Sequence, residues 1–166
     1  APPGPIGLIA GGGQFPLLFA ERARERGYTV VAAAYLGEAE RSLSDRVDAV
    51  EWLHLGQVKR LIRFLKSHEV QATVMMGAIR KTRMFTDVRP DMKAIALIAG
   101  MKHTHDDALL RAVAKTLEKE GIQVASATFL LPGLLAAEGC WTRRRPHRSG
   151  RADIDVGLKL AREIGR

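Results

Sequence analysis

The sequence predicts an α/β protein with a Rossmann-like, mostly parallel sheet and helices on both faces. Short, continuously apolar runs alternate along the 166 residues with segments of helical spacing, and glycines stand at several of the junctions. Strands that alternate with helices pair in parallel through right-handed crossovers. Strands that are apolar throughout are typical of a sheet buried on both faces. In such a sheet, ligands bind outside the carboxyl ends of the strands.

The first unit of this pattern is a strand, a tight turn and a helix. An apolar run that begins at Ile6 leads into the turn. The residues of the turn are Gly11, Gly12, Gly13 and Gln14. Residues without Cβ let the backbone bend sharply and leave its N–H groups accessible, and a helix N-terminus attracts phosphate or carboxylate. The turn is therefore either a phosphate cradle or the close packing that the first turn of an α/β fold requires.

The turn matches neither of the common nucleotide motifs. No Gly-Lys-Ser/Thr follows it, as a P-loop requires. The third glycine position of the dinucleotide fingerprint holds Pro16, and Glu38, the nearest acidic residue, stands beyond the expected end of the second strand. Pro16 suits the first turn of a helix, because the amide it lacks has no partner there.

Periodicity predicts the elements of the first half of the chain. Residues 14–26 form an amphipathic helix that ends at Gly27. The apolar side of this helix is expected to consist of Phe15, Leu18, Phe19 and Ala23. Residues 28–34 predict a buried strand, and residues 48–54 predict a weaker one. A second amphipathic helix is predicted at residues 57–68. Its apolar side chains recur at helical spacing and are Val58, Leu61, Ile62 and Leu65.

The second half continues the alternation. Residues 71–79 predict a strand that Gly77 interrupts near its carboxyl end, and residues 122–127 predict a fifth strand. The remaining helices are predicted at residues 90–101, 106–120 and 153–164. Residues 128–139 predict a short helical segment broken at Pro132, and residues 143–151 predict a basic loop. We expect residues 1–150 to form one Rossmann-like domain and residues 151–166 to form the last helix.

Composition and charge limit the class of protein. The single Cys140 excludes an intramolecular disulfide, so we expect a reducing cytoplasm. The longest apolar stretch, residues 127–137, is too short to span a bilayer. A net charge of +8 attracts nucleic acid, anionic lipid headgroups or phosphorylated substrates. We expect no nucleic-acid partner, because no aromatic residues interleave with the arginines of residues 143–151. Those arginines form either an exposed loop or a contact with an anionic membrane surface.

Two groups of polar residues are candidates for chemistry. Arg80 and Lys81 end the fourth predicted strand, where they either meet a phosphate or remain solvated. Asp106 and Asp107 begin a predicted helix, whose dipole stabilises carboxylates there. Alternatively, one of these carboxylates points into the crevice and holds a cation such as Mg²⁺, which prefers oxygen ligands. Three segments should meet at the carboxyl edge of the sheet. They are residues 11–14, residues 77–81 and the loop before Asp106.

Four stretches, in this order along the chain, carry a resemblance to a known family. They are Gly7-Leu8-Ile9-Ala10-Gly11-Gly12-Gly13-Gln14-Phe15-Pro16, Asp106-Asp107-Ala108-Leu109-Leu110-Arg111, Thr128-Phe129-Leu130 and Ala161-Arg162-Glu163-Ile164-Gly165-Arg166. Together they resemble the LpxI family of UDP-2,3-diacylglucosamine pyrophosphohydrolases in the lipid A pathway. The resemblance runs from about Ile6 to the last residue.

The resemblance implies a cytoplasmic enzyme, peripheral to the inner membrane. Members of the family hydrolyse UDP-2,3-diacylglucosamine to UMP and 2,3-diacylglucosamine 1-phosphate (lipid X) with Mg²⁺. The family also implies a C-terminal domain, which carries the essential aspartate and lies outside this chain, so no catalytic residue is assigned here. We therefore expect an N-terminal half that is inactive alone. Its expected partners are its own C-terminal domain and the inner-membrane surface, and a homodimer is left open.

Carried over to this sequence, the resemblance implies a set of substrate contacts and metal ligands. The substrate contacts are Gly11, Gly12, Gly13, Gln14, Gly77, Arg80, Lys81, Asp106 and Asp107. The metal ligands are Asp106 and Asp107. Two other hypotheses stay open. One is a nucleotide- or dinucleotide-binding regulatory module without hydrolase activity, and the other is a basic nucleic-acid-binding domain, whose binding would depend steeply on salt.

Overall fold

The computed structural model describes residues 4–80, 88–99 and 106–165, and for Asp106 and Asp107 it describes the backbone alone. The chain divides into two compact units, residues 1–135 and 136–166. The division after Leu135 differs from the expected one after residue 150. Each unit is described by itself.

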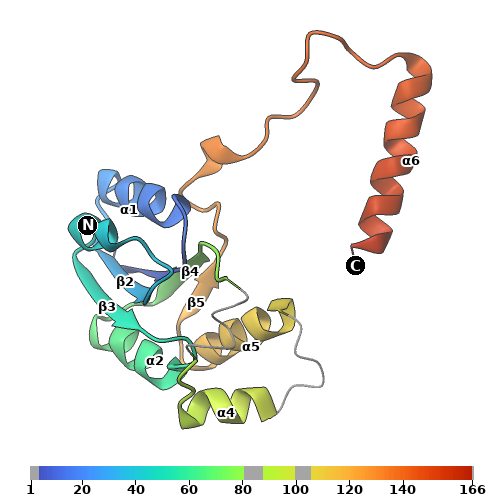
Figure 1. Ribbon diagram of the computed structural model, residues 1–166. Helices are drawn as coiled ribbons and strands as arrows, with labels where there is room; N and C mark the ends of the chain where they lie inside the picture. Colours follow the sequence, from blue (N-terminus) through green and yellow to red (C-terminus); the bar gives the residue numbers. More distant parts are fainter. Residues whose placement is uncertain (1–3, 81–87, 100–105, 166) are drawn as a thin grey trace. The chain divides into compact units, whose positions relative to one another are not determined.

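The first unit is built on a five-stranded parallel sheet with the strand order β3-β2-β1-β4-β5. Its strands are β1 (Ile6–Ala10), β2 (Val30–Tyr35), β3 (Ala49–Leu53), β4 (Ala72–Met76) and β5 (Gln123–Ala125). The chain starts in the middle with β1, adds β2 and β3 on one side, and then crosses to β4 on the other (Figure 1). The predicted α/β class is confirmed. The order in which strands are added reverses between β1 and β4. This is the topological switch point at which such sheets bind ligands.

Helices cover both faces of this sheet. The helices are α1 (Phe15–Glu25), α2 (Val58–Ser67), α4 (Met92–Ala99) and α5 (Asp106–Lys119), and the short 3₁₀ turns are η1 (Arg41–Arg46) and η2 (Pro132–Leu134). Figure 1 shows α1 on one face and α2, α4 and α5 on the other. Successive residues of β1 alternate between the two cores, with Leu8 in the α1 core and Ile9 in the α2 core. β1 and β2 are apolar at every position, as predicted, whereas β4 also contains the buried Thr73.

The apolar side predicted for α1 is only half right. The buried residues of α1 are Pro16, Leu17, Phe19, Ala20 and Ala23. Phe15 and Leu18, by contrast, are 57% and 37% exposed. The stripe that packs on the sheet starts at Pro16, and Phe15 and Leu18 lie three residues apart on the outer side of the helix. The side predicted for α2 is confirmed, because Val58, Leu61, Ile62 and Leu65 are all buried.

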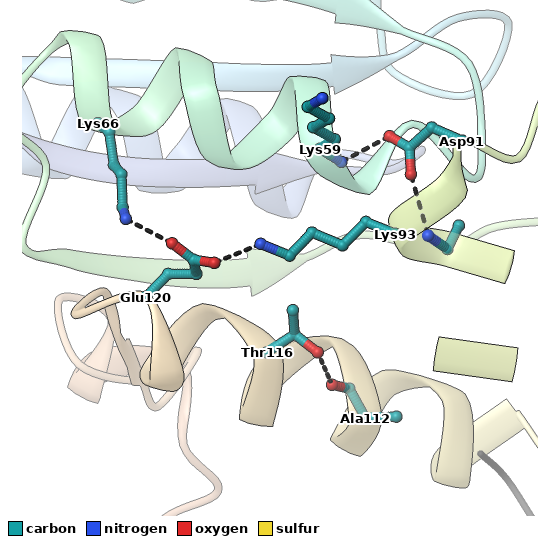
Figure 2. Close-up of polar contacts among 8 residues, drawn as sticks. Lys59, Lys66, Asp91, Lys93, Ala112, Thr116 and Glu120 are labelled. Carbon is teal, nitrogen blue, oxygen red and sulfur yellow. Dashed lines mark hydrogen bonds and ion pairs between the residues drawn. The ribbon is translucent and has the colours of Figure 1, made fainter. Parts of the chain in front are cut away.

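One carboxylate joins the N-termini of α2 and α4 (Figure 2). Asp91, the residue before α4, accepts a hydrogen bond from the Ala94 amide at 2.9 Å and caps that helix. Its other oxygen accepts from the Lys59 amide in the first turn of α2 at 2.6 Å. Each of these amides lacks a partner within its own helix. Asp91 therefore satisfies orphan donors of two helices at once.

We expect Asp91→Ala to lower the free energy of unfolding by about 2 kcal/mol, since loss of a single cap costs roughly 0.5–2 kcal/mol and two are lost here. Asp91→Asn keeps one carbonyl acceptor and should lose about half as much. Urea denaturation followed by circular dichroism measures both. An alanine variant as stable as the parent would contradict the double cap.

A second carboxylate ties α2 and α4 to the end of α5. Glu120 accepts hydrogen bonds from the ammonium groups of Lys66 in α2 and Lys93 in α4 (Figure 2). These bonds lower the pKa of Glu120 to about 2. Because the pair of lysines is solvent-exposed, this cluster fixes the relative placement of the three helices more than it stabilises the fold.

The second unit consists of an extended segment and the helix α6 (Arg148–Ile164). The helix begins at Arg148 and not at Asp153 as predicted, so residues 148–151 of the expected basic loop are helical. Its first backbone bond runs from the Arg151 amide to the His147 carbonyl at 2.9 Å. None of the residues described in α6 is buried. In the parts of the chain that the structure describes, no helix has the length and apolar character needed to cross a bilayer.

Candidate functional site

The glycine turn after β1 is held by the segment after β4. The Gly11 amide donates to the Met76 carbonyl at 2.8 Å, and the Gly12 amide donates to the Ala78 carbonyl at 2.7 Å. The Ala78 amide donates back to Gly12 at 2.9 Å. The two bonds between Gly12 and Ala78 form an antiparallel bridge just beyond the parallel β1–β4 ladder. The amides of Gly11 and Gly12 therefore already have backbone acceptors, and the substrate contacts at these two residues stay a prediction.

Two of the glycines serve close packing of this contact. A Cβ added at Gly11 would lie 2.6 Å from the Ala78 carbonyl oxygen, and one added at Gly77 would lie 2.7 Å from the Gly11 carbonyl carbon. Gly77 also has a φ of +93°, in the left-handed region that favours glycine. The packing interpretation of the turn therefore holds for Gly11, and Gly77 of the facing segment packs against it.

The later half of the turn remains open to a ligand. Gly13 has a φ of +97°, and no atom lies within 4 Å of where its Cβ would be. Gln14 is the N-cap of α1 and makes no side-chain cap bond, and Pro16 occupies the first helical turn as predicted. Among the described residues, no group accepts a hydrogen bond from the Gly13 or Gln14 amide. These amides lie at the positive end of a helix dipole.

A cavity of about 590 Å³ lies next to this turn. It is lined by Gly12, Gly13, residues 36–41, Trp52, Ala78 and Arg80. These segments follow or end β1, β2, β3 and β4, so the cavity lies at the carboxyl edge of the sheet, beside the switch point. Its volume is in the range of small-molecule sites. Of the predicted site residues, the structure brings Gly12, Gly13 and Arg80 together here.

Arg80 is held at the cavity by a carboxylate that sequence reasoning had set aside. Its Nε donates to Glu38 Oε2 at 3.2 Å, and its Nη2 donates to the Gly37 carbonyl at 2.6 Å. The Glu38 side chain is 3% exposed, whereas that of Arg80 is 61% exposed. Glu38 stands beyond β2, as predicted, yet its loop turns back over the carboxyl edge. Its position as the first acidic residue after a buried strand was the available signal.

Trp52 and Arg41 complete the wall of the cavity. The Arg41 guanidinium carbon lies 6.0 Å from the centroid of the Trp52 ring, a cation–π distance. Trp52 is also partly buried against the core of the α1 face. Packing alone would be the ordinary interpretation of a tryptophan in a weak strand, and the sequence holds no signal that its ring borders a cavity.

The remaining predicted site residues are placed less completely. Lys81 and the loop before Asp106 lie outside the described residues, as do the side chains of Asp106 and Asp107. The helix α5 begins at Asp106, as predicted. Within the described ranges, no group of three or more His, Cys, Asp or Glu side chains has the arrangement of a metal site. The magnesium site at Asp106 and Asp107 therefore stays a prediction.

Comparison with known proteins agrees with the fold. UDP-2,3-diacylglucosamine pyrophosphatase LpxI of Caulobacter vibrioides is 28% identical over 164 residues, which cover 97% of this chain and 58% of that protein. The crystal structure of UDP-glucose-4-epimerase from Stenotrophomonas maltophila, with bound NAD and formylated UDP-arabinopyranose, superposes with a TM-score of 0.52 at 13% identity. The superposition covers 99% of this chain and 50% of the epimerase chain, and this likeness shows the fold alone.

The family described as the LpxI N-terminal domain matches residues 5–134. The match ends at Leu134, one residue before the first compact unit ends at Leu135. It contains the glycine turn, the Glu38–Arg80 pair and all five strands of the sheet. The chain therefore belongs to the LpxI family and contains its N-terminal domain.

Proposed function

We propose that this chain is the substrate-binding half of a UDP-2,3-diacylglucosamine pyrophosphatase. The longer protein hydrolyses the pyrophosphate bond of UDP-2,3-diacylglucosamine to UMP and 2,3-diacylglucosamine 1-phosphate (lipid X), a step of lipid A biosynthesis. Family membership supports the reaction, since the curated relative is named for it. This chain spans 58% of that relative, and we place the essential aspartate in the C-terminal part.

The observation that carries the proposal is the cavity at the switch point. Attack on a pyrophosphate requires neutralisation of the phosphoryl oxygens. The Gly13 and Gln14 amides, at the start of the 11-residue α1, and the exposed guanidinium of Arg80 supply positive potential on one side of the cavity. Arg80 is already oriented by Glu38 and Gly37, so it can present its remaining N–H groups without first losing side-chain freedom. We place the diphosphate there.

We also propose that Asp106 and Asp107 hold Mg²⁺, together with groups of the C-terminal domain. Their carboxylates are the oxygen donors that Mg²⁺ prefers, and the start of α5 follows a crossover from β4. When bound, the cation would neutralise charge on the phosphoryl oxygens. The cations of residues 143–151 are the proposed contact with the inner-membrane surface, at about 1 kcal/mol each. The enzyme would act from the cytoplasmic side.

The reaction is tested on the full-length protein with Asp106→Asn and Asp107→Asn. We expect at least one of them to lower kcat by about 10- to 100-fold, the usual loss when a metal site is weakened. Asp155→Asn, an exposed carboxylate of α6, is the matched control and should leave the rate unchanged. Full activity in both test variants would remove these residues from the mechanism.

Ligand binding separates the enzyme from the regulatory alternative. Thermal unfolding of the same protein should shift upward with UDP and stay unchanged with NAD or NADP, because only a ligand of the native state stabilises it. A shift with NAD or NADP and none with UDP would overturn the proposed function in favour of a dinucleotide-binding module.

A further inference from the structure

The two ends of the cavity differ in chemistry. One end has the Gly13 turn and Arg80, which offer N–H groups and positive charge. The other end has Glu40, Arg41 and Trp52, which offer a carboxylate, a guanidinium and an indole ring. At the first end the Glu38 carboxylate is paired with Arg80, whereas the Glu40 carboxylate at the second end repels phosphate, so a diphosphate is directed to the first end. The second end has the groups that recognise neutral rings and hydroxyls.

The register of the sheet sets the separation of these ends. Ala10 of β1 pairs with Ala34 of β2, which in turn pairs with Trp52 of β3. Trp52 therefore lies in the same row as the last residue of β1, two strand spacings away, or about 10 Å. The glycine turn begins directly after Ala10. A nucleotide bridges a separation of this order between its base and its phosphates.

The side chains at the second end suit a nucleoside. The Trp52 ring borders the cavity, and the exposed Arg41 guanidinium lies over the ring, 6.0 Å from its centroid, so a base that stacks on Trp52 takes the place of Arg41. Glu40 is exposed at the cavity, and its carboxylate can accept hydrogen bonds from sugar hydroxyls. In Rossmann-like sheets an acidic residue after the second strand accepts such hydrogen bonds from the ribose.

We propose that Glu40, Arg41 and Trp52 form a nucleoside subsite, in which the base stacks on Trp52 and the ribose hydroxyls donate to Glu40. The inference rests on the proposed function, because it assigns the uridine end of the same substrate. It also sets the direction of the ligand. With the base over β3 and the diphosphate beside β1, the diacylglucosamine group leaves on the β4 side of the sheet.

Isothermal calorimetry on the full-length protein tests the subsite with UDP, inorganic pyrophosphate and 2′,3′-dideoxyuridine diphosphate. We expect Trp52→Leu to weaken UDP binding by about tenfold, a typical loss for one stacked base, and to leave pyrophosphate binding unchanged. Trp141→Leu, which removes a tryptophan of the second unit that is 71% exposed, should alter neither. Circular dichroism confirms that each variant is folded.

The exposed Glu40 gives a second, milder variant. Glu40→Gln should weaken the binding of UDP. The dideoxy analogue should bind the parent and Glu40→Gln with equal affinity, since this analogue lacks the ribose hydroxyls. If UDP and pyrophosphate bind equally well and neither Trp52→Leu nor Glu40→Gln changes UDP affinity, the subsite is wrong while the diphosphate site stands. If neither UDP nor pyrophosphate binds, the proposed function itself fails.

Discussion

Gly77→Ala should lower the free energy of unfolding by about 2–5 kcal/mol and abolish ligand binding at the glycine turn. Two costs combine in this estimate. A φ of +93° is strained for any residue with a Cβ, at roughly 1–2 kcal/mol. The new methyl group would also lie 2.7 Å from both the Gly11 carbonyl carbon and the Gly12 carbonyl oxygen, and overpacking of this kind costs about 1–3 kcal/mol. Urea denaturation measures the free energy of unfolding, and calorimetry with UDP measures the loss of ligand binding.

Gly121→Ala separates these two costs. Gly121 has a φ of +84°, but no atom lies within 4 Å of the position of its Cβ. Only the backbone strain applies there, so the expected loss is about 1–2 kcal/mol. Equal losses in the two variants would show that the contact between Gly77 and the Gly11–Gly12 backbone contributes nothing to stability.

Phe19→Ala should cost about 3–5 kcal/mol of unfolding free energy, the range for a large aromatic side chain removed from a core. Phe19 is fully buried and packs in the core that α1 forms with β1 and β2. Loss of its ring removes apolar contacts and leaves a cavity that the surrounding side chains fill only in part. Urea denaturation followed by circular dichroism measures the change.

Phe15→Ala is the matched control in the same helix. Phe15 is 57% exposed, and we expect its replacement to change the unfolding free energy by less than about 1 kcal/mol. The comparison tests which side of α1 faces the sheet. A loss at Phe15 as large as that at Phe19 would contradict the packing described here.

The order of strands and helices follows from sequence because each element carries its own pattern. The strands β1 and β2 are apolar at every position, which only burial on both faces explains. In α2 the charged and apolar residues alternate with helical period, so a single side can face the core. In α1, Phe15, Leu17, Leu18 and Phe19 surround most of the helix, and the sheet selects among them. That selection is a tertiary effect, which local periodicity does not contain.

The site is less accessible to prediction, because it depends on contacts between distant segments. The glycines of the turn are visible in the sequence, but their division into packing glycines and an open Gly13 depends on where residues 77–78 lie. The partner of Arg80 is likewise unpredictable, because Glu38 reaches it only once β2 and β4 flank β1. The early start of α6 follows from its backbone bond to His147, which a run of arginines does not reveal.

Asp91 also has a consequence for how the sheet opens. The helix α2 completes the half of the fold built on β2 and β3, whereas α4 belongs to the half built on β4 and β5. When the first turn of either helix frays, the carboxylate loses one donor and the orientation that the other donor requires. Amide protons of both turns should therefore exchange with solvent in one concerted event, so the two halves share a single cooperative unit.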